Sequence, residues 1–334
     1  MKRASLPLQR RNLLAGGLVV AYEMATRSGI AQTSKRARIG FLSGGPALSS
    51  GESIFGVFKA ALGELGWRVG ETLVIEERFA NGDFSNLPRL ASELVALRPD
   101  LIACTGAQET KALQAATREI PIVFMSVADP VYLGLVESIP RPGRNITGFT
   151  QGPQVLWGKR LDLLTELLGR PLRRLAWLGN PGNAGSEYNW TIAKEAASKI
   201  GAEIARIEVD KADAIDEAFE ALKNVDALLV QYDFLFFVIR SRIAALAIEK
   251  QIPAVYENRS LVLAGGLMSY GTDLRENFRQ AAGYVDRVLK GARIADLPVV
   301  QASRFELLLN TGAAKAIGLT IPPSLLVRAD EVIE

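Results

Sequence analysis

The feature that most constrains the fold is the regular alternation of short apolar runs and helical patterns from Arg38 onward. The runs are continuously apolar, and the segments between them repeat apolar residues at three- and four-residue steps. This combination is typical of parallel sheets that are covered by helices on both faces. About ten strands over roughly 300 residues fit two doubly wound sheets better than one. The sequence therefore predicts an α/β protein with two doubly wound parallel-sheet lobes joined by a hinge.

The expected strands share apolar composition, and the expected helices share one apolar face. We expect strands at 38–42, 73–77, 101–104, 122–125, 146–150, 174–178, 203–208, 227–231, 254–256 and 267–270. We expect helices at 54–65, 87–97, 110–118, 156–168, 188–200, 214–222, 236–250 and 274–289. A capping box formed by Ser49 and Glu52 predicts the start of the first helix, and Gly66 predicts its end.

Two stretches rich in Pro and Gly, at 140–145 and 264–266, predict crossings between the lobes. Small residues at such crossings ease hinge bending. We place the first lobe at residues 36–147 with 267–300, and the second at 148–264 with 301–334. In this division the strand at 146–150 leads into the second lobe.

Polar and small residues follow the strands, where open α/β sheets bind their ligands. From these strand ends we select twelve candidate ligand-binding residues. They are Ser43, Gly44, Thr105, Gly106, Gln108, Ser126 and Asp129 in the first half, and Asn180, Tyr232, Asp233, Glu257 and Tyr270 in the second.

Several candidates also have a purely structural interpretation. Thr105 and Gln108 precede a helix, so they could cap its free N–H groups or contact a ligand. Asp129 precedes a proline and suits a turn as well as a ligand. Asp233 and Glu257 suit a ligand ammonium group or a helix cap. Tyr232, Tyr256 and Tyr270 could stack on a flat ligand or pack in the core.

Histidine is absent from the sequence, and cysteine occurs once. Nucleophilic pairs that need histidine are therefore excluded, and so are disulfides and zinc clusters built from several cysteines. Cys104 lies in an apolar run and is expected to be a buried, inert thiol. The sequence contains no Walker A motif, and Gly179, Gly182 and Gly185 do not have the spacing of a dinucleotide fingerprint. We therefore expect no cofactor and no metal.

The N-terminus has the pattern of an export signal, residues 1–31, with cleavage before Gln32. A basic segment precedes an apolar stretch, Leu13–Ala21, and Arg10-Arg11 resembles a twin-arginine signal. The alternative is a frayed basic tail. Nine apolar residues are too few to span a bilayer, and no cysteine near the cleavage site could carry a lipid. These features predict a periplasmic protein without a permanent membrane anchor, exported by the Sec or the twin-arginine route.

The positive charge of the chain lies in this signal. It holds five of the 39 Lys and Arg residues and one of the 36 Asp and Glu residues, so 34 basic and 35 acidic residues remain. This balance gives no electrostatic case for nucleic acid as a partner.

Several motifs, in order, resemble the ABC transporter substrate-binding family related to tryptophan-binding proteins. The segment Gly265–Gly271 carries the resemblance most specifically. The other matching segments are 98–102, 120–124, 129–130, 143–148, 297–299, 305–310, 314–322 and 328–331.

The resemblance implies a type I periplasmic binding-protein fold whose lobes close on a solute and deliver it to a membrane permease. Related members bind amino acids, including aromatic ones. By position, Thr105 and nearby backbone groups would meet a carboxylate, with Asp233 or Glu257 opposite. The segment Phe234–Val238 is more hydrophobic than the family pattern, which favours a more apolar or aromatic solute.

This implies a monomeric carrier that is not an enzyme. Two rival functions share the same features. One is a sensory ligand-binding protein that acts on a signalling partner. The other is a carboxylate-dependent enzyme that uses Asp129 with Asp233 or Glu257. A sugar-responsive transcription regulator has the same fold, but an export signal stands here in place of a DNA-binding helix-turn-helix.

Overall fold

A five-stranded parallel sheet forms the first part of the computed structural model, which describes residues 36–47, 53–152 and 156–334. Its strands are β1 (Ala37–Ser43), β2 (Leu73–Phe79), β3 (Leu101–Cys104), β4 (Ile122–Val127) and β5 (Ile146–Thr150). Their order is β2-β1-β3-β4-β5. All four strand pairs are parallel. The order reverses direction beside β1, which leaves a crevice between the loops after β1 and β3.

The second sheet has seven strands in the order β12-β11-β10-β9-β8-β6-β7. Their bounds are β6 (Arg174–Gly179), β7 (Glu203–Glu208), β8 (Ala227–Val230), β9 (Ala254–Tyr256), β10 (Met268–Thr272), β11 (Phe305–Asn310) and β12 (Glu331–Ile333). Only β10 and β11 pair in the antiparallel sense among these strands. The run from β7 to β10 repeats the order of the first sheet, so a second crevice lies between the loops after β6 and β8.

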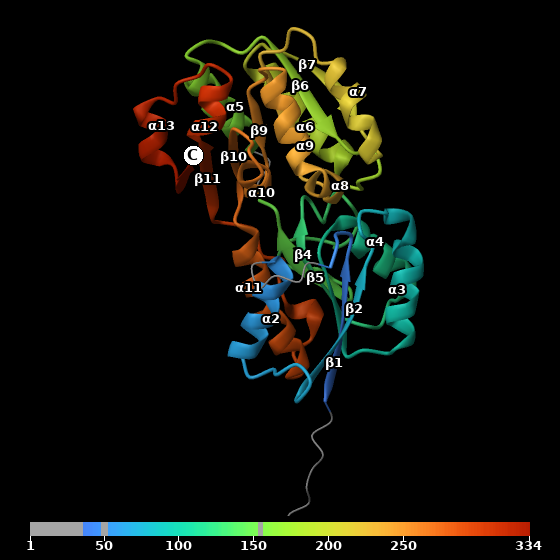
Figure 1. Ribbon diagram of the computed structural model, residues 1–334. Helices are drawn as coiled ribbons and strands as arrows, with labels where there is room; N and C mark the ends of the chain where they lie inside the picture. Colours follow the sequence, from blue (N-terminus) through green and yellow to red (C-terminus); the bar gives the residue numbers. More distant parts are fainter. Residues whose placement is uncertain (1–35, 48–52, 153–155) are drawn as a thin grey trace, which may run out of the picture. The chain divides into compact units, whose positions relative to one another are not determined.

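Helices cover the two faces of each sheet. Helices α2 (Ile54–Glu64) and α11 (Leu274–Leu289) lie on one face of the first sheet, and α3 (Leu87–Ala96) and α4 (Ala107–Ala116) lie on the other (Figure 1). The remaining helices are α5 (Leu156–Leu168), α6 (Ser186–Lys199), α7 (Ile215–Glu220), α8 (Phe234–Val238), α9 (Arg240–Glu249), α10 (Arg259–Leu263), α12 (Thr311–Ala316) and α13 (Pro323–Arg328), with 3₁₀ turns at Phe84–Asn86, Ala212–Ala214 and Ile294–Asp296.

The apolar strands bury side chains on both faces, as the sequence predicts. Ile39 and Phe41 of β1 belong to the core under α2 and α11, whereas Leu42 belongs to the core under α3 and α4. The second sheet repeats this pattern: Trp177 and Leu178 of β6 point into different cores. The predicted α/β class with two doubly wound parallel-sheet lobes is confirmed.

The beginning of the first long helix differs in detail from the prediction. Ser49 and Glu52 lie outside the described residues. Helix α2 begins at Ile54, and the hydroxyl oxygen of Ser53 accepts a hydrogen bond from the Gly56 N–H at 3.0 Å. Ser53 therefore supplies the cap. Gly66 has φ +92°, so it ends the helix in the left-handed conformation, as predicted.

The strands place two of the predicted lobe boundaries differently. Strand β5 pairs with β4 and belongs to the first sheet, and β10 pairs with β9 and β11 in the second. We call residues 36–150 with 274–300 lobe one, and 156–272 with 305–334 lobe two. The glycines at 264–266 end α10, where Gly265 has φ +105°, and they do not form a crossing. Local composition cannot distinguish a helix end from a hinge.

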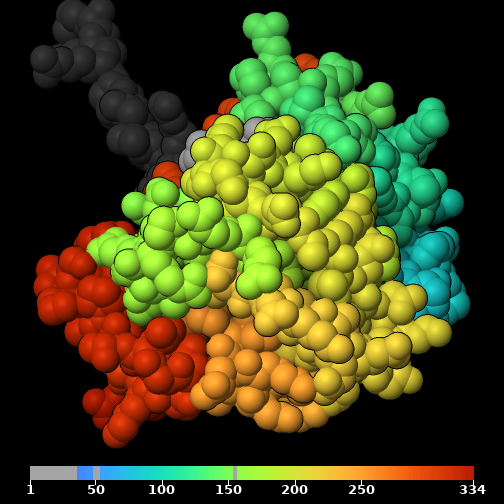
Figure 2. All heavy atoms as spheres, turned by 90° about the horizontal axis from the view of Figure 1, so that it is seen from above, coloured from blue at the N-terminus to red at the C-terminus, as the bar shows by residue number. Residues whose placement is uncertain are grey.

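The C-terminal segment completes lobe two. Arg328 of α13 forms an ion pair with Glu166 of α5 at 2.7 Å, and Leu325 is fully buried in the same core. Figure 2 shows this segment, in red, beside the green segment that contains α5. Strands β11 and β12 and helices α10, α12 and α13 were not assigned from the sequence pattern.

We predict that Cys104 does not react with thiol reagents in the folded protein. Its side chain is fully buried, and burial raises the pKa of the thiol well above its ordinary value of 9.0. Titration with a chromogenic disulfide should show no reaction in buffer and one thiol per chain in guanidinium chloride. Stoichiometric labelling of the native protein would contradict the burial.

Candidate functional site

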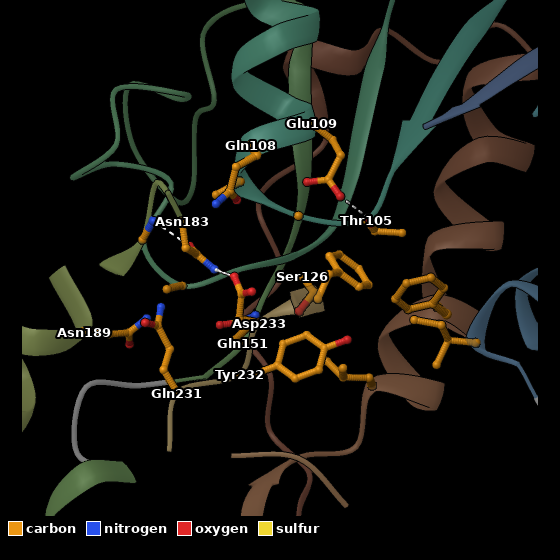
Figure 3. Close-up of a pocket in the computed structure, with 18 residues that line it drawn as sticks. Thr105, Gln108, Glu109, Ser126, Gln151, Asn183, Asn189, Gln231, Tyr232 and Asp233 are labelled. Carbon is orange, nitrogen blue, oxygen red and sulfur yellow. Dashed lines mark hydrogen bonds between the residues drawn. The ribbon is translucent and has the colours of Figure 1, made fainter. Parts of the chain in front are cut away.

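The strand-end loops of both lobes meet around one pocket, which we call the polar pocket. Its lining from lobe one and the adjoining crossing includes Ile54, Thr105, Gly106, Ala107, Gln108, Glu109, Ser126, Ala128, Gln151, Leu274 and Phe278. Its lining from lobe two includes Asn183, Gly185, Asn189, Gln231, Tyr232, Asp233 and Phe234. Both crevices made by strand-order reversal therefore contribute to the same site (Figure 3).

On the side of lobe one, Glu109 is the central group. One of its carboxylate oxygens accepts hydrogen bonds from the Gly44 N–H and from the Thr105 hydroxyl, both at 2.5 Å. The residue is only 1% exposed. It lies in the first turn of α4, and Figure 3 shows its carboxylate beside Thr105. The Thr105 hydroxyl, which was expected to meet a ligand carboxylate, is thus occupied by a side chain of the protein.

On the side of lobe two, Asp233 is held by three hydrogen bonds. The amide groups of Asn180 and Asn183 donate to its two oxygens at 3.0 and 2.7 Å. The Leu235 N–H donates at 2.8 Å, so Asp233 also caps α8. The sequence left open whether Asp233 caps a helix or faces a ligand. In the structure it caps α8 and also lines the pocket.

The environment of these two carboxyls disfavours their charged forms. Burial raises the pKa of Glu109, and the nearby Asp233 raises it further. Burial also raises the pKa of Asp233, against the opposing effect of Asn180 and Asn183. Burial raises the pKa of the Tyr232 hydroxyl, and the charges of Asp233 and Glu109 raise it further. The described lining of the polar pocket contains no Lys or Arg.

Two further polar groups of the pocket are buried without a hydrogen-bond partner among the described residues. They are the hydroxyl of Ser126 and the amide oxygen of Gln231. These residues are 6% and 1% exposed. Buried polar atoms are normally paired, so these two indicate positions where a bound solute or water would make contact.

Glu257 plays a different part. It lies 3.5 Å from Arg160 in a pair whose side chains are both less than 10% exposed, and it accepts the Tyr232 N–H at 3.1 Å. Arg160 also donates to the Tyr270 carbonyl oxygen at 2.7 Å. Burial raises the pKa of Glu257, and the charge of Arg160 opposes that rise. Glu257 therefore supports the position of Tyr232 through a neutralised pair.

A second, more apolar pocket adjoins the first, and the two share Ile54, Thr105, Tyr232, Phe234 and Leu274. We call it the aromatic pocket because six rings line it: Phe41, Phe55, Phe79, Tyr232, Phe234 and Phe237. Its two arginines, Arg259 and Arg275, form ion pairs with the carboxylates of Glu306, Glu331 and Asp273.

Several contacts join the lobes around these pockets. The Gln108 amide donates to the Gly182 carbonyl oxygen at 3.2 Å, and the rings of Tyr132 and Tyr188 lie 5.0 Å apart. Phe234 packs against Gly44 and Gly45; a Cβ atom at Gly45 would lie 2.7 Å from its ring. The ring can approach this closely because both positions lack a side chain.

The twelve candidates from the sequence divide into three groups. The polar pocket brings together Thr105, Gly106, Gln108, Ser126, Tyr232 and Asp233. Ser43 lines the aromatic pocket, and Gly44, Asn180 and Glu257 bond to residues of the two pockets.

Asp129 and Tyr270 are placed otherwise. Asp129 accepts the N–H groups of Val131 and Tyr132 at 3.0 and 2.9 Å, so it forms the turn that was its alternative interpretation. Tyr270 packs against a hydrophobic core and near Phe305. Tyr256, which was considered for stacking, is fully buried in the core of lobe two.

The twelve candidates do not include Glu109, Asn183, Gln231 and Arg160. Asn183 follows β6 and Gln231 follows β8, so a wider selection of strand ends would have included both. Glu109 and Arg160 lie within helices and carried no such signal. An acidic residue in a first turn, such as Glu109, is ordinarily explained by the helix dipole alone.

No helix within 36–47, 53–152 and 156–334 has the length and apolar character needed to cross a membrane. Over the same ranges, no cluster of three or more acidic or cysteine side chains could hold a metal ion.

Comparisons with known proteins agree on one family. The sequence model for ABC transporter substrate binding proteins matches residues 44–333. The tyrosine-binding protein of Clostridioides difficile (strain R20291) is 26% identical over 263 residues, which are 78% of this chain and 75% of that one.

Two solved structures are similar over 89% of this chain and 100% of theirs. The ABC domain of Streptococcus pneumoniae in complex with L-Trp has a TM-score of 0.82 at 25% identity. A conserved domain protein from Vibrio cholerae O1 biovar El Tor strain N16961 has a TM-score of 0.84 at 26% identity. The arrangement of lobes and sheets is that of the type I periplasmic binding proteins.

We predict that Glu109→Gln becomes more stable relative to the wild type as the pH rises from 4.5 to about 8. Because the pKa of Glu109 is raised in the folded state, its contribution to stability is present below the ordinary value of 4.5 and is lost as the pH rises through the raised pKa. Urea unfolding across this range measures the difference, with Glu64→Gln on the exposed side of α2 as the control. A pH-independent difference would contradict the raised pKa.

We predict that Arg160→Met destabilises the protein by about 3–5 kcal/mol, because it leaves the Glu257 carboxylate buried and unpaired. Adding Glu257→Gln should recover part of the loss. Denaturant melts of the single and double variants test this, with Arg242→Met in an exposed pair as a control of little effect. A double variant no more stable than Arg160→Met would show that the lost contacts of the arginine itself dominate.

Proposed function

Because this chain belongs to the ABC transporter substrate-binding protein family, we propose that it is the periplasmic solute-binding component of an ABC importer. It captures a small solute, an amino acid or an aromatic compound, between its lobes and delivers it to the permease. It acts as a monomeric carrier and does not transform the solute. Export by the predicted signal, residues 1–31, brings it to the periplasm.

The observation that supports this most directly is the polar pocket, to which strand-end loops of both lobes contribute. A solute there contacts Thr105 and Ser126 from lobe one and Asp233 from lobe two. Such a solute stabilises the arrangement in which the lobes are together, because only that arrangement offers both sets of contacts. The closed pair of lobes is the form that the permease recognises.

The aromatic pocket supports the choice of solute. Its rings can bury an apolar or aromatic body while the polar pocket holds a charged or hydrogen-bonding end. The relatives named for tyrosine and solved with L-Trp bind solutes of this kind.

We predict that a melting-temperature screen against amino acids, aromatic acids and amines, sugars and nucleosides gives a hit among the compounds with an aromatic body. A solute at 100 times its Kd adds about 2.7 kcal/mol to the stability of the folded state. Asp233→Asn should weaken the hit by ~30-fold, about 2 kcal/mol, by calorimetry. Asp162→Asn, which is exposed on α5, is the matched control and should bind normally.

The outcomes separate the rival functions. A solute recovered unchanged after incubation supports a carrier, whereas turnover that is lost in Asp233→Asn would identify an enzyme. Neighbouring permease and ATPase genes support transport, and a neighbouring kinase or regulator gene would support a sensory protein. A hit confined to sugars or nucleosides would contradict the proposed solute class.

A further inference from the structure

We infer that the solute of this site is an aromatic amine, a cation without a carboxylate, because a carboxyl group of the protein, that of Glu109, already accepts from the Thr105 hydroxyl and the Gly44 N–H. This inference rests on the proposed function and narrows its solute class. It is carried by geometry at three places: the α4 end of the polar pocket, the opposing Asp233, and the aromatic pocket beside them.

Two hydrogen-bond donors beside the polar pocket are already engaged by Glu109. The Thr105 hydroxyl and the Gly44 N–H converge on one oxygen of Glu109 at 2.5 Å each. A carboxylate is the acceptor that such a pair of donors suits, and the protein supplies it from its own chain. A solute carboxylate could use these donors only by displacing a buried side chain.

Glu109 and Asp233 enter the polar pocket from opposite lobes, and neither has an ion-pair partner among the described residues. The one buried arginine nearby, Arg160, is already paired with Glu257. A third carboxylate, brought by an amino acid, would share a water-poor space with two carboxyl groups whose charged forms are already disfavoured. A solute ammonium group would instead stabilise the charged forms of both.

Two side chains of the polar pocket have hydrogen-bonding groups without a partner among the described residues. The buried Gln231 amide oxygen and Ser126 hydroxyl lack partners among the described residues, and both line the polar pocket. Glu109 and Asp233, whose oxygens are further acceptors, line the same pocket (Figure 3). A protonated primary amine supplies up to three N–H donors, which this set of acceptors matches.

The aromatic pocket adjoins the polar pocket and shares Tyr232 and Phe234 with it, so it is the nearest place for the rest of the solute. Its arginines, Arg259 and Arg275, are the alternative place for a solute carboxylate, but both are held in ion pairs with Glu306. A ring in this pocket with its amine between Glu109 and Asp233 satisfies both pockets.

The test compares three probes that differ in one group: tyramine, L-tyrosine and 3-(4-hydroxyphenyl)propionate. By calorimetry on the purified protein, tyramine should bind at least about tenfold more tightly than tyrosine, and the propionate should not bind. Glu109→Gln keeps the size of the side chain and an acceptor for Gly44, and should reduce tyramine affinity by about tenfold or more. Glu195→Gln, on the exposed side of α6 outside both pockets, is the matched control and should bind as the wild type does.

The results are decisive in each direction. If tyrosine binds as tightly as tyramine, the inference is wrong, but the proposed function as a carrier of an amino acid is retained. Failure of all three probes would overturn both the inference and the proposed aromatic solute class. If Glu109→Gln does not fold, the order of affinities of the three probes for the wild-type protein still tests the inference, because that measurement needs no variant.

Discussion

The site depends on where the strand order of each sheet reverses. Beside β1 and beside β6 the following connections leave in opposite directions, so the loops after these strands and after β3 and β8 are separated. Each lobe thereby gains a crevice without any loss of core packing. The polar pocket forms because both crevices face one another across the lobe contact, where Gln108 meets Gly182. This topology brings carboxyl groups from two separate sheets, those of Glu109 and Asp233, into one site.

Within that site, burial decides the chemistry. Glu257 is offset by Arg160, whereas Glu109 and Asp233 are held only by neutral donors. A buried carboxylate without a cation is costly, and a solute cation that removes this cost gains affinity from it. The polar pocket therefore selects its solute through buried carboxyl groups that lack a cationic partner within the described part of the chain. The aromatic pocket selects through its shape and its apolar area.

Much of the fold could be predicted because the buried strands of parallel sheets are continuous apolar runs in the sequence. The ten expected strands all form, and α5 and α11 match their expected bounds. Strand β12 was missed because its three residues, Glu331–Ile333, form no apolar run. Strand β11 was missed although Leu307–Leu309 are apolar, because so short a run does not distinguish a strand from a helix. The candidate site was predictable where residues directly follow strands, as Thr105 and Asp233 do. Glu109 was not, because its role depends on a hydrogen bond from Gly44, 65 residues earlier in the chain.

The route of the chain through α11 has a consequence for the order of folding. The strands of the first sheet are complete at residue 150, but the helix that packs beside α2 on one of their faces begins only at Leu274. Asn277 of that helix also donates to the Met125 and Thr150 carbonyl oxygens of β4 and β5. During synthesis, the lobe that is made first thus keeps one apolar face only partly covered, by α2, until most of the other lobe has been made. The lobe that is first in sequence is completed late, and the two lobes acquire their final cores as interdependent units.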